Sequence, residues 1–308
     1  MAQTYAPTSL IKGTLGTFGL AFQESSRFSL IERISTVVES SASEEKYAWL
    51  AEAPQMAEVT SSINFVGLGD ASYTLTNKEY AAGLVFKRRD VENDQAGMIG
   101  QRIRQLATTA AFHPNKLLID LLINGNSSTL GLDYTGEAFF NDTHAVRGKQ
   151  SATQDNIISG GGTTTAQIAA DIGLSIGRML KFESESGEPF NEMITKVAIV
   201  TPTALWQPMH EAVHGALISQ TSNVQLAGMQ IDLIPTGRLD ASDANNFYVL
   251  DVSGSLKPLI FQFNTGVEFA EDRTGELAFS ANQYRYKAQA FYTAGYSCWQ
   301  KAVRVVNS

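Results

Sequence analysis

The chain contains little of several residue types, and each scarcity excludes a class of protein. One cysteine among 308 residues cannot form an internal disulfide, so we expect an intracellular origin. No apolar run reaches the roughly 18 residues of a transmembrane helix, and the first residues lack the pattern of a signal peptide. We therefore expect no membrane association. Lys and Arg number 23 against 31 Asp and Glu, and this net charge of −8 disfavours tight nucleic-acid binding.

Apolar residues, in contrast, are plentiful. They make up 44% of the chain, enough for a buried core and too many for global disorder. The length suits one large domain or several small ones.

The first 45 residues have the pattern of an arm rather than of a domain. Their apolar positions follow no clear period through Ser26. A short amphipathic helix is predicted where apolar residues then recur at helical spacing, at Phe28, Leu30, Ile31, Ile34 and Val37. A polar linker from Glu39 to Glu45 follows. We interpret residues 1–45 as an N-terminal arm, and the alternative is a frayed terminus.

Residues 46–93 are predicted to form two strands around a long polar excursion. The excursion, residues 60–72, is rich in Gly and Ser and has too few apolar residues to fold on itself. Loops of this length are uncommon inside a compact domain unless they have a function or are disordered. An extended hairpin that packs on a neighbouring subunit would bury the excursion.

A long helix is predicted from Asp94, a good N-cap, to the stop at Asn124-Gly125. Pro114 should kink this helix or restart it. Apolar residues recur at helical spacing on both sides of Pro114, namely Met98, Ile99, Ile103, Leu106, Ala107, Ala110, Ala111, Leu117, Leu118, Leu121 and Leu122.

The remainder alternates loops, helices and strands. Residues 126–163 are predicted to be loops with one short ordered segment at 138–140. Helices are predicted around 168–180 and 203–218, and strands around 196–201, 229–234, 247–251 and 259–263. A late strand should turn one face to the core, formed by Tyr284, Tyr286, Ala288, Ala290 and Tyr292. The fold class is therefore α+β.

One motif suggests catalysis. His210-Glu211-Ala212-Val213-His214 matches the HExxH pattern, in which two His on a helix bind Zn²⁺ and the Glu activates water. A third protein ligand is missing, because no His follows His214 closely and the next glutamate is Glu268. Asp232 and Asp240 are predicted to lie in a strand and a turn, and Pro208 favours a helix start. We expect two partly exposed His on an ordinary helix, and no metal, cofactor or catalytic residue.

A basic cluster and the single cysteine are the other candidates. The cluster Lys87-Arg88-Arg89 is followed at once by acidic residues, so local or intersubunit ion pairing is expected before phosphate binding. Cys298, beside Trp299, is predicted to be a buried thiol.

The chain resembles the major head subunits of Mu-like phages and prophages, which are Hong Kong 97-type capsid proteins. The matching segments occur in order: Tyr47-Ala-Trp-Leu50, Pro54-Gln-Met56, Asn77-Lys78, Arg88-Arg-Asp-Val-Glu-Asn-Asp94, Pro114 to Leu122, Phe139-Phe-Asn-Asp-Thr-His144, and the tyrosine-rich tail from Tyr284 to Tyr296. The resemblance implies an N-terminal arm (1–45), an extended loop (46–93), a peripheral domain with a long spine helix (94–150 and 265–308), and an axial domain (151–264).

The resemblance also implies a function without a catalytic site. The chain would be a major capsid protein of a tailed phage, assembled in the cytoplasm of a bacterial host into pentamers and hexamers of an icosahedral shell around double-stranded DNA. Implied partners are further copies, a portal, and scaffold or decoration proteins, with only weak contact to DNA. Candidate contacts between subunits are Phe65, Leu68, Tyr73, Lys87, Arg88, Arg89, Asp90 and Glu92. The alternatives are an encapsulin-like compartment shell and the zinc metallopeptidase.

Overall fold

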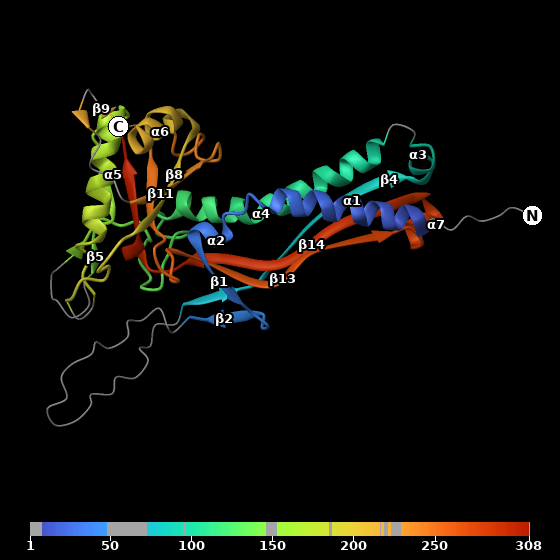
Figure 1. Ribbon diagram of the computed structural model, residues 1–308. Helices are drawn as coiled ribbons and strands as arrows, with labels where there is room; N and C mark the ends of the chain where they lie inside the picture. Colours follow the sequence, from blue (N-terminus) through green and yellow to red (C-terminus); the bar gives the residue numbers. More distant parts are fainter. Residues whose placement is uncertain are drawn as a thin grey trace, which may run out of the picture.

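The computed structural model describes residues 8–47, 73–94, 97–145, 153–184, 187–215, 217–218, 221–222 and 229–307. The chain forms an elongated part, in which two helices lie along long strands, and a compact part at one end of it (Figure 1). The helices are α1 (Thr8–Ser26), α2 (Ile31–Ile34), α3 (Arg88–Glu92), α4 (Met98–Asn124), α5 (Thr165–Met179), α6 (Trp206–His214) and α7 (Glu276–Ser280), with the 3-10 turns η2 (Thr203–Leu205) and η3 (Trp299–Lys301). The strands are β1 (Ser35–Glu39), β2 (Glu44–Lys46), β3 (Thr74–Thr76), β4 (Lys78–Lys87), β5 (His144–Ala145), β6 (Thr153–Gln154), β7 (Ile157–Ser159), β8 (Lys196–Thr201), β9 (Leu217–Ile218), β10 (Thr221–Ser222), β11 (Gln230–Pro235), β12 (Phe247–Asp251), β13 (Leu259–Asp272), β14 (Gln283–Tyr296) and β15 (Ala302–Val306).

The elongated part is built on a four-stranded sheet of order β1-β13-β14-β4. β13 and β14 are antiparallel over their length, from Leu259 opposite Tyr296 to Asp272 opposite Arg285. β4 pairs antiparallel with β14, while β1 runs parallel to the first residues of β13. The predicted inward face of β14 is confirmed, because its alternate side chains are no more than 8% exposed, namely Tyr284, Tyr286, Ala288, Ala290 and Tyr292.

The predicted long helix is α4, which begins four residues later than expected. The carboxylate of Asp94 nevertheless caps it, because it accepts hydrogen bonds from the backbone N–H of Met98 (3.0 Å) and of Ile99 (3.0 Å). Pro114 lies inside α4 and does not restart it, so that alternative is wrong. Both sides of Pro114 pack on buried neighbours, which offsets the lost backbone hydrogen bond.

The N-terminal prediction was wrong in its local detail. Residues without a clear apolar period form the 19-residue helix α1, and the predicted helix over 28–37 is only α2, followed by the strand β1. Periodicity misled because Leu15 and Leu20 of α1 are 54% and 72% exposed. Contacts with the elongated part stabilise α1 instead, including the ring of Phe18 stacked on that of Phe269, with centroids 4.6 Å apart. The β-branched residues of β1 favour a strand.

The buried side chain of Asn115 ties this N-terminal segment to α4. Its Oδ1 accepts a hydrogen bond from the backbone N–H of Leu30 (2.8 Å), and its Nδ2 donates one to the carbonyl of Phe28 (2.9 Å). Arg33 of α2 then forms a bidentate ion pair with Asp232 of β11, at 2.6 and 2.9 Å. The N-terminal segment therefore bridges the elongated and compact parts.

The compact part is a five-stranded sheet of order β11-β8-β12-β15-β7, packed by α5 and α6. The predicted strands β8, β11 and β12 are confirmed, and so is the α+β class. The prediction missed β15 and the distal half of β13, and its helix over 203–218 was too long, because Gly215 leaves the helical conformation after α6. One hydrophobic cluster joins the two parts, since Leu118 and Leu122 of α4 belong to the same core as β8 and β12.

His144 is a titratable group sealed in this core. Its side chain is 1% exposed and stacks on the indole of Trp299, with ring centroids 3.9 Å apart. Burial lowers the pKa of His144 to about 4, although contacts to Phe139 and Asn156 oppose the shift. The Glu137 carboxylate lies 3.5 Å from Nδ1. The imidazole is therefore neutral at pH 7.

The lowered pKa of His144 predicts an acid-sensitive fold. The unfolded chain takes up the proton near pH 6.5 and the folded chain only near pH 4, so stability falls as the pH drops between these values and levels off below them. We expect this group to contribute up to about 3 kcal/mol of that loss. Urea unfolding at pH 7 and pH 4.5 measures it, and His144→Gln should flatten the dependence. The exposed control His210→Gln should leave the slope unchanged; an equally steep slope in His144→Gln contradicts the assignment.

Candidate assembly surfaces

The base of the predicted extended loop is held by a buried polar network. Backbone N–H of Tyr47 donates to the carbonyl of Tyr73 (2.7 Å), beside the short β2–β3 ladder. The Tyr47 hydroxyl donates to Oε1 of Gln262 (2.7 Å), a β13 residue that is 0% exposed. Nε2 of Gln262 in turn donates to Oδ1 of Asn77 (2.8 Å). Residues 48–72 therefore connect two adjacent, firmly held points of the sheet.

Of the candidate contacts Phe65, Leu68 and Tyr73, only Tyr73 lies in the described part of the chain. Its hydroxyl accepts a hydrogen bond from the backbone N–H of Tyr296 (3.0 Å), and burial raises its pKa to about 12. Tyr73 thus anchors the base of the loop within its own subunit. Phe65 and Leu68 lie outside the described residues, so their role as contacts stays a prediction.

The charged cluster forms the turn between the sheet and the long helix. Lys87 ends β4, and the following residues form α3 at the end of the elongated part far from the compact part (Figure 1). The expected local ion pair is present: Nε of Arg88 lies 2.7 Å from Oε1 of Glu92, and this hydrogen bond raises the pKa of Arg88. Lys87, Arg89 and Asp90 are exposed and form no ion pair with another described residue.

The same end exposes apolar side chains to solvent. Phe279 of α7 is 91% exposed, Met98 at the start of α4 is 66% exposed, and Val85 of β4 is 55% exposed. Large apolar side chains with this exposure mark a contact surface when they gather in one region. The sequence pattern placed Met98 on the apolar face of the long helix, and its exposure shows that this assignment was wrong. The pattern did not single out Phe279 and Val85, because an apolar residue next to charged ones can be either exposed or buried.

The HExxH motif lies on α6 without the environment of a peptidase. His210, Glu211 and His214 are exposed, and the Glu211 carboxylate accepts hydrogen bonds from Thr165 Oγ1 (3.1 Å) and Gln207 Nε2 (3.2 Å). Both conceivable third ligands are engaged elsewhere: Asp232 binds Arg33, and Asp240 accepts hydrogen bonds from the Thr203 backbone N–H and hydroxyl. Within the described ranges, no three metal-ligating side chains gather.

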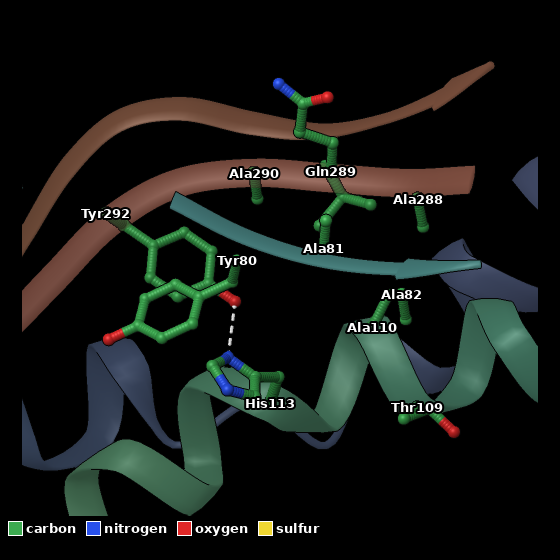
Figure 2. A pocket seen from close by; sticks show the side chains of 11 residues that line it. Tyr80, Ala81, Ala82, Thr109, Ala110, His113, Ala288, Gln289, Ala290 and Tyr292 are labelled. Carbon is green, nitrogen blue, oxygen red and sulfur yellow. Dashed lines mark hydrogen bonds between the residues drawn. The ribbon is translucent and has the colours of Figure 1, made fainter. Parts of the chain in front are cut away.

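A cavity of about 120 Å³ lies between α4 and the strands β4 and β14 (Figure 2). Small side chains leave the space, among them Ala82, Ala110 and Ala290, while His113 lies at one end with its Nδ1 2.8 Å from the hydroxyl of Tyr292. Burial, and then the charges of Lys116 and Arg238, lower the pKa of His113. Most of the lining is apolar, and its other polar members are Tyr80, Thr109 and Gln289. We interpret the cavity as a packing defect beneath the helix rather than as a catalytic site.

Comparison with known proteins decides the identity of the fold. Residues 8–172 and 235–308 match the family described as "Mu-like prophage major head subunit gpT". The chain belongs to this family. It is therefore a major head subunit, a structural component of a virion capsid rather than an enzyme. The matched residues include α1, α4, β13 and β14, the elements of the elongated part.

Individual gpT-family relatives and solved structures agree. The chain is 23% identical over 297 residues to the "Mu-like prophage FluMu major head subunit" of Haemophilus influenzae, covering 95% of this chain and 72% of that protein. It is 23% identical over 275 residues to the "Major capsid protein" of Escherichia phage Mu, covering 89% and 65%. The procapsid of bacteriophage JBD30 gives a TM-score of 0.54 at 20% identity, covering 98% of this chain and 76% of that chain.

These comparisons also settle the alternatives. The fold is the α+β fold of Hong Kong 97-type capsid proteins, and the relatives by sequence are phage head subunits rather than compartment shells or peptidases. No described helix is long and apolar enough to cross a membrane.

The cavity beneath α4 gives a prediction for the gpT-family subunit. Ala110→Leu should fill the space and raise the free energy of unfolding by about 1 kcal/mol. Ala107, on the same helix, is 0% exposed and does not line the cavity, so Ala107→Leu should overpack and destabilise by about 1–3 kcal/mol. Urea unfolding of both variants measures the difference. Equal destabilisation by both would show that no usable space exists at Ala110.

Proposed function

We propose that this head subunit assembles through its own surfaces into pentamers and hexamers of a closed icosahedral shell that encloses double-stranded DNA. Membership of the gpT family carries this proposal. The net charge of −8 supports a shell that contacts its DNA weakly. A portal, and scaffold or decoration proteins, are the further partners that such a shell requires.

Each of the four predicted segments would have its own role in the shell. The N-terminal arm (1–45) and the extended loop (46–93) would contribute contacts with neighbouring copies, although α1, α2, β1 and β4 within them also pack on their own subunit. Residues 94–150 with 265–308 would form the peripheral domain, and residues 151–264 the axial domain around the capsomer centre. The long strand β14 and the helix α4 support the peripheral domain, and the strands β8, β11 and β12 of the compact sheet support the axial domain (Figure 1). β15 (Ala302–Val306) lies in the compact sheet although it falls within residues 265–308. Repeated contacts between identical copies then fix the symmetry of the shell.

The loop is the first part to test. Replacing residues 51–70 by a short Gly-Ser linker removes Phe65 and Leu68 but keeps Tyr47, Tyr73 and their hydrogen bonds. We expect a folded subunit with an unchanged unfolding midpoint that does not form closed particles in electron micrographs. Particles of normal size and stability from this variant would exclude the loop from assembly.

The charged turn allows a second test. Arg88→Glu combined with Arg89→Glu should impair particle assembly more than folding, because both side chains are exposed and the Arg88–Glu92 pair is a surface ion pair of small stabilising value. Particle yield by sedimentation and the melting temperature of the subunit are measured together. A double reversal at exposed sites of the compact part, Lys181→Glu combined with Arg238→Glu, controls for the same change in net charge. Normal particles with a lowered melting temperature would contradict the proposal.

A further inference from the structure

α6 carries a pair of exposed imidazoles that the assembly surfaces above do not use. His210 and His214 lie one helical turn apart on the same face, with ring centroids 4.8 Å apart and ring planes inclined by 55°. The indole of Trp206, one turn earlier, has its centroid 5.4 Å from that of His210. The helix α6, which carries the three rings, lies in the compact part (Figure 1).

The spacing of the two rings is that of a chelate. Two imidazoles on one tetrahedral ion, with metal–nitrogen bonds of about 2.0–2.1 Å, place their ring centroids about 5 Å apart. The observed 4.8 Å is close to this value, so the two side chains need little rearrangement to share an ion. Imidazole suits zinc, copper and nickel, and not the harder magnesium or calcium ions.

The surroundings of the pair explain why this arrangement is not a hydrolytic centre. Glu211, which would activate water in a peptidase, turns towards α5 and hydrogen-bonds Thr165. Residues 215–228, which follow the motif, contain no His, Cys, Asp or Glu. A metal held by His210 and His214 would therefore keep at least two coordination positions that the described part of this chain does not fill.

We propose that His210 and His214 chelate a divalent transition metal of the zinc, copper or nickel class, and that a second copy of the chain completes its coordination in the shell. The first half concerns the single subunit and departs from our expectation of no metal. The second half rests on the proposed function: a shell subunit has further copies around it, and an exposed helix presenting a half-filled metal site is a place where copies can be joined.

Metal binding by the subunit tests the first half. Titration of the purified full chain with Zn²⁺ in a calorimeter should show one site per chain, and His210→Gln or His214→Gln should weaken it on the order of a hundredfold, because one imidazole loses the chelate effect. Glu211→Gln is the matched control on the same turn and should bind as the wild type does. Unchanged affinity in both His variants, or an equal loss in Glu211→Gln, overturns the chelate.

Particle stability tests the second half. Zn²⁺ should raise the temperature at which wild-type particles disassemble, EDTA should reverse the shift, and His214→Gln particles should show none. Binding to the subunit without any shift in the particles would overturn joining by a second copy and leave the chelate standing. If the chain forms no particles at all, the proposed function fails while the calorimetric result still decides the metal site.

Discussion

The antiparallel pairing of β13 with β14 is the interaction on which the rest of the structure depends. β13 begins in the main core beside β8 and β12 and ends in the second cluster beneath α1 and α4, and β14 runs back from the second cluster to the main core. Every other element of the elongated part attaches to this pair: β4 and β1 extend the sheet, and α4 covers its inner face. A thin two-layer structure buries little apolar surface per residue. The hydrogen bonds between β13 and β14, which connect the two hydrophobic clusters, are therefore what keeps the elongated part rigid.

Much of the fold could be predicted because local pattern and tertiary environment agree. β8, β12 and the inner face of β14 are rich in β-branched and aromatic residues and are buried apart from Lys196, and α4 keeps its apolar stripe across Pro114. α1 could not be predicted, because its outer face carries Leu15 and Leu20 where a polar residue would be expected. The distal half of β13 was not predicted, because its two register shifts disturb the alternation of buried and exposed residues from which a strand is recognised.

Some residues of the candidate assembly surfaces could be predicted from the sequence and others could not. Residues that bind within the subunit leave a mark in the pattern, as Arg88 and Glu92 do at helical spacing. Tyr73, whose contact with a neighbour stays a prediction, holds the base of the loop through Tyr296, a partner more than two hundred positions away. Exposed residues such as Phe279 have no partner in one copy, so a single sequence holds no signal for them. Only the family relationship indicates that further copies of the chain provide these partners.

The two irregularities in β13 have a consequence for how one polypeptide fits unlike surroundings. Each places one extra residue on β13 opposite β14, between Phe263 and Thr265 and between Thr265 and Glu268. Extra residues interrupt the ladder and increase the local twist. They lie just past the end of β1, where β4 joins the opposite edge of the sheet. The free-energy cost of bending the sheet is therefore lowest in this short stretch. The elongated part can turn here relative to the compact part, so the curvature of the sheet can differ between copies while both hydrophobic clusters stay intact.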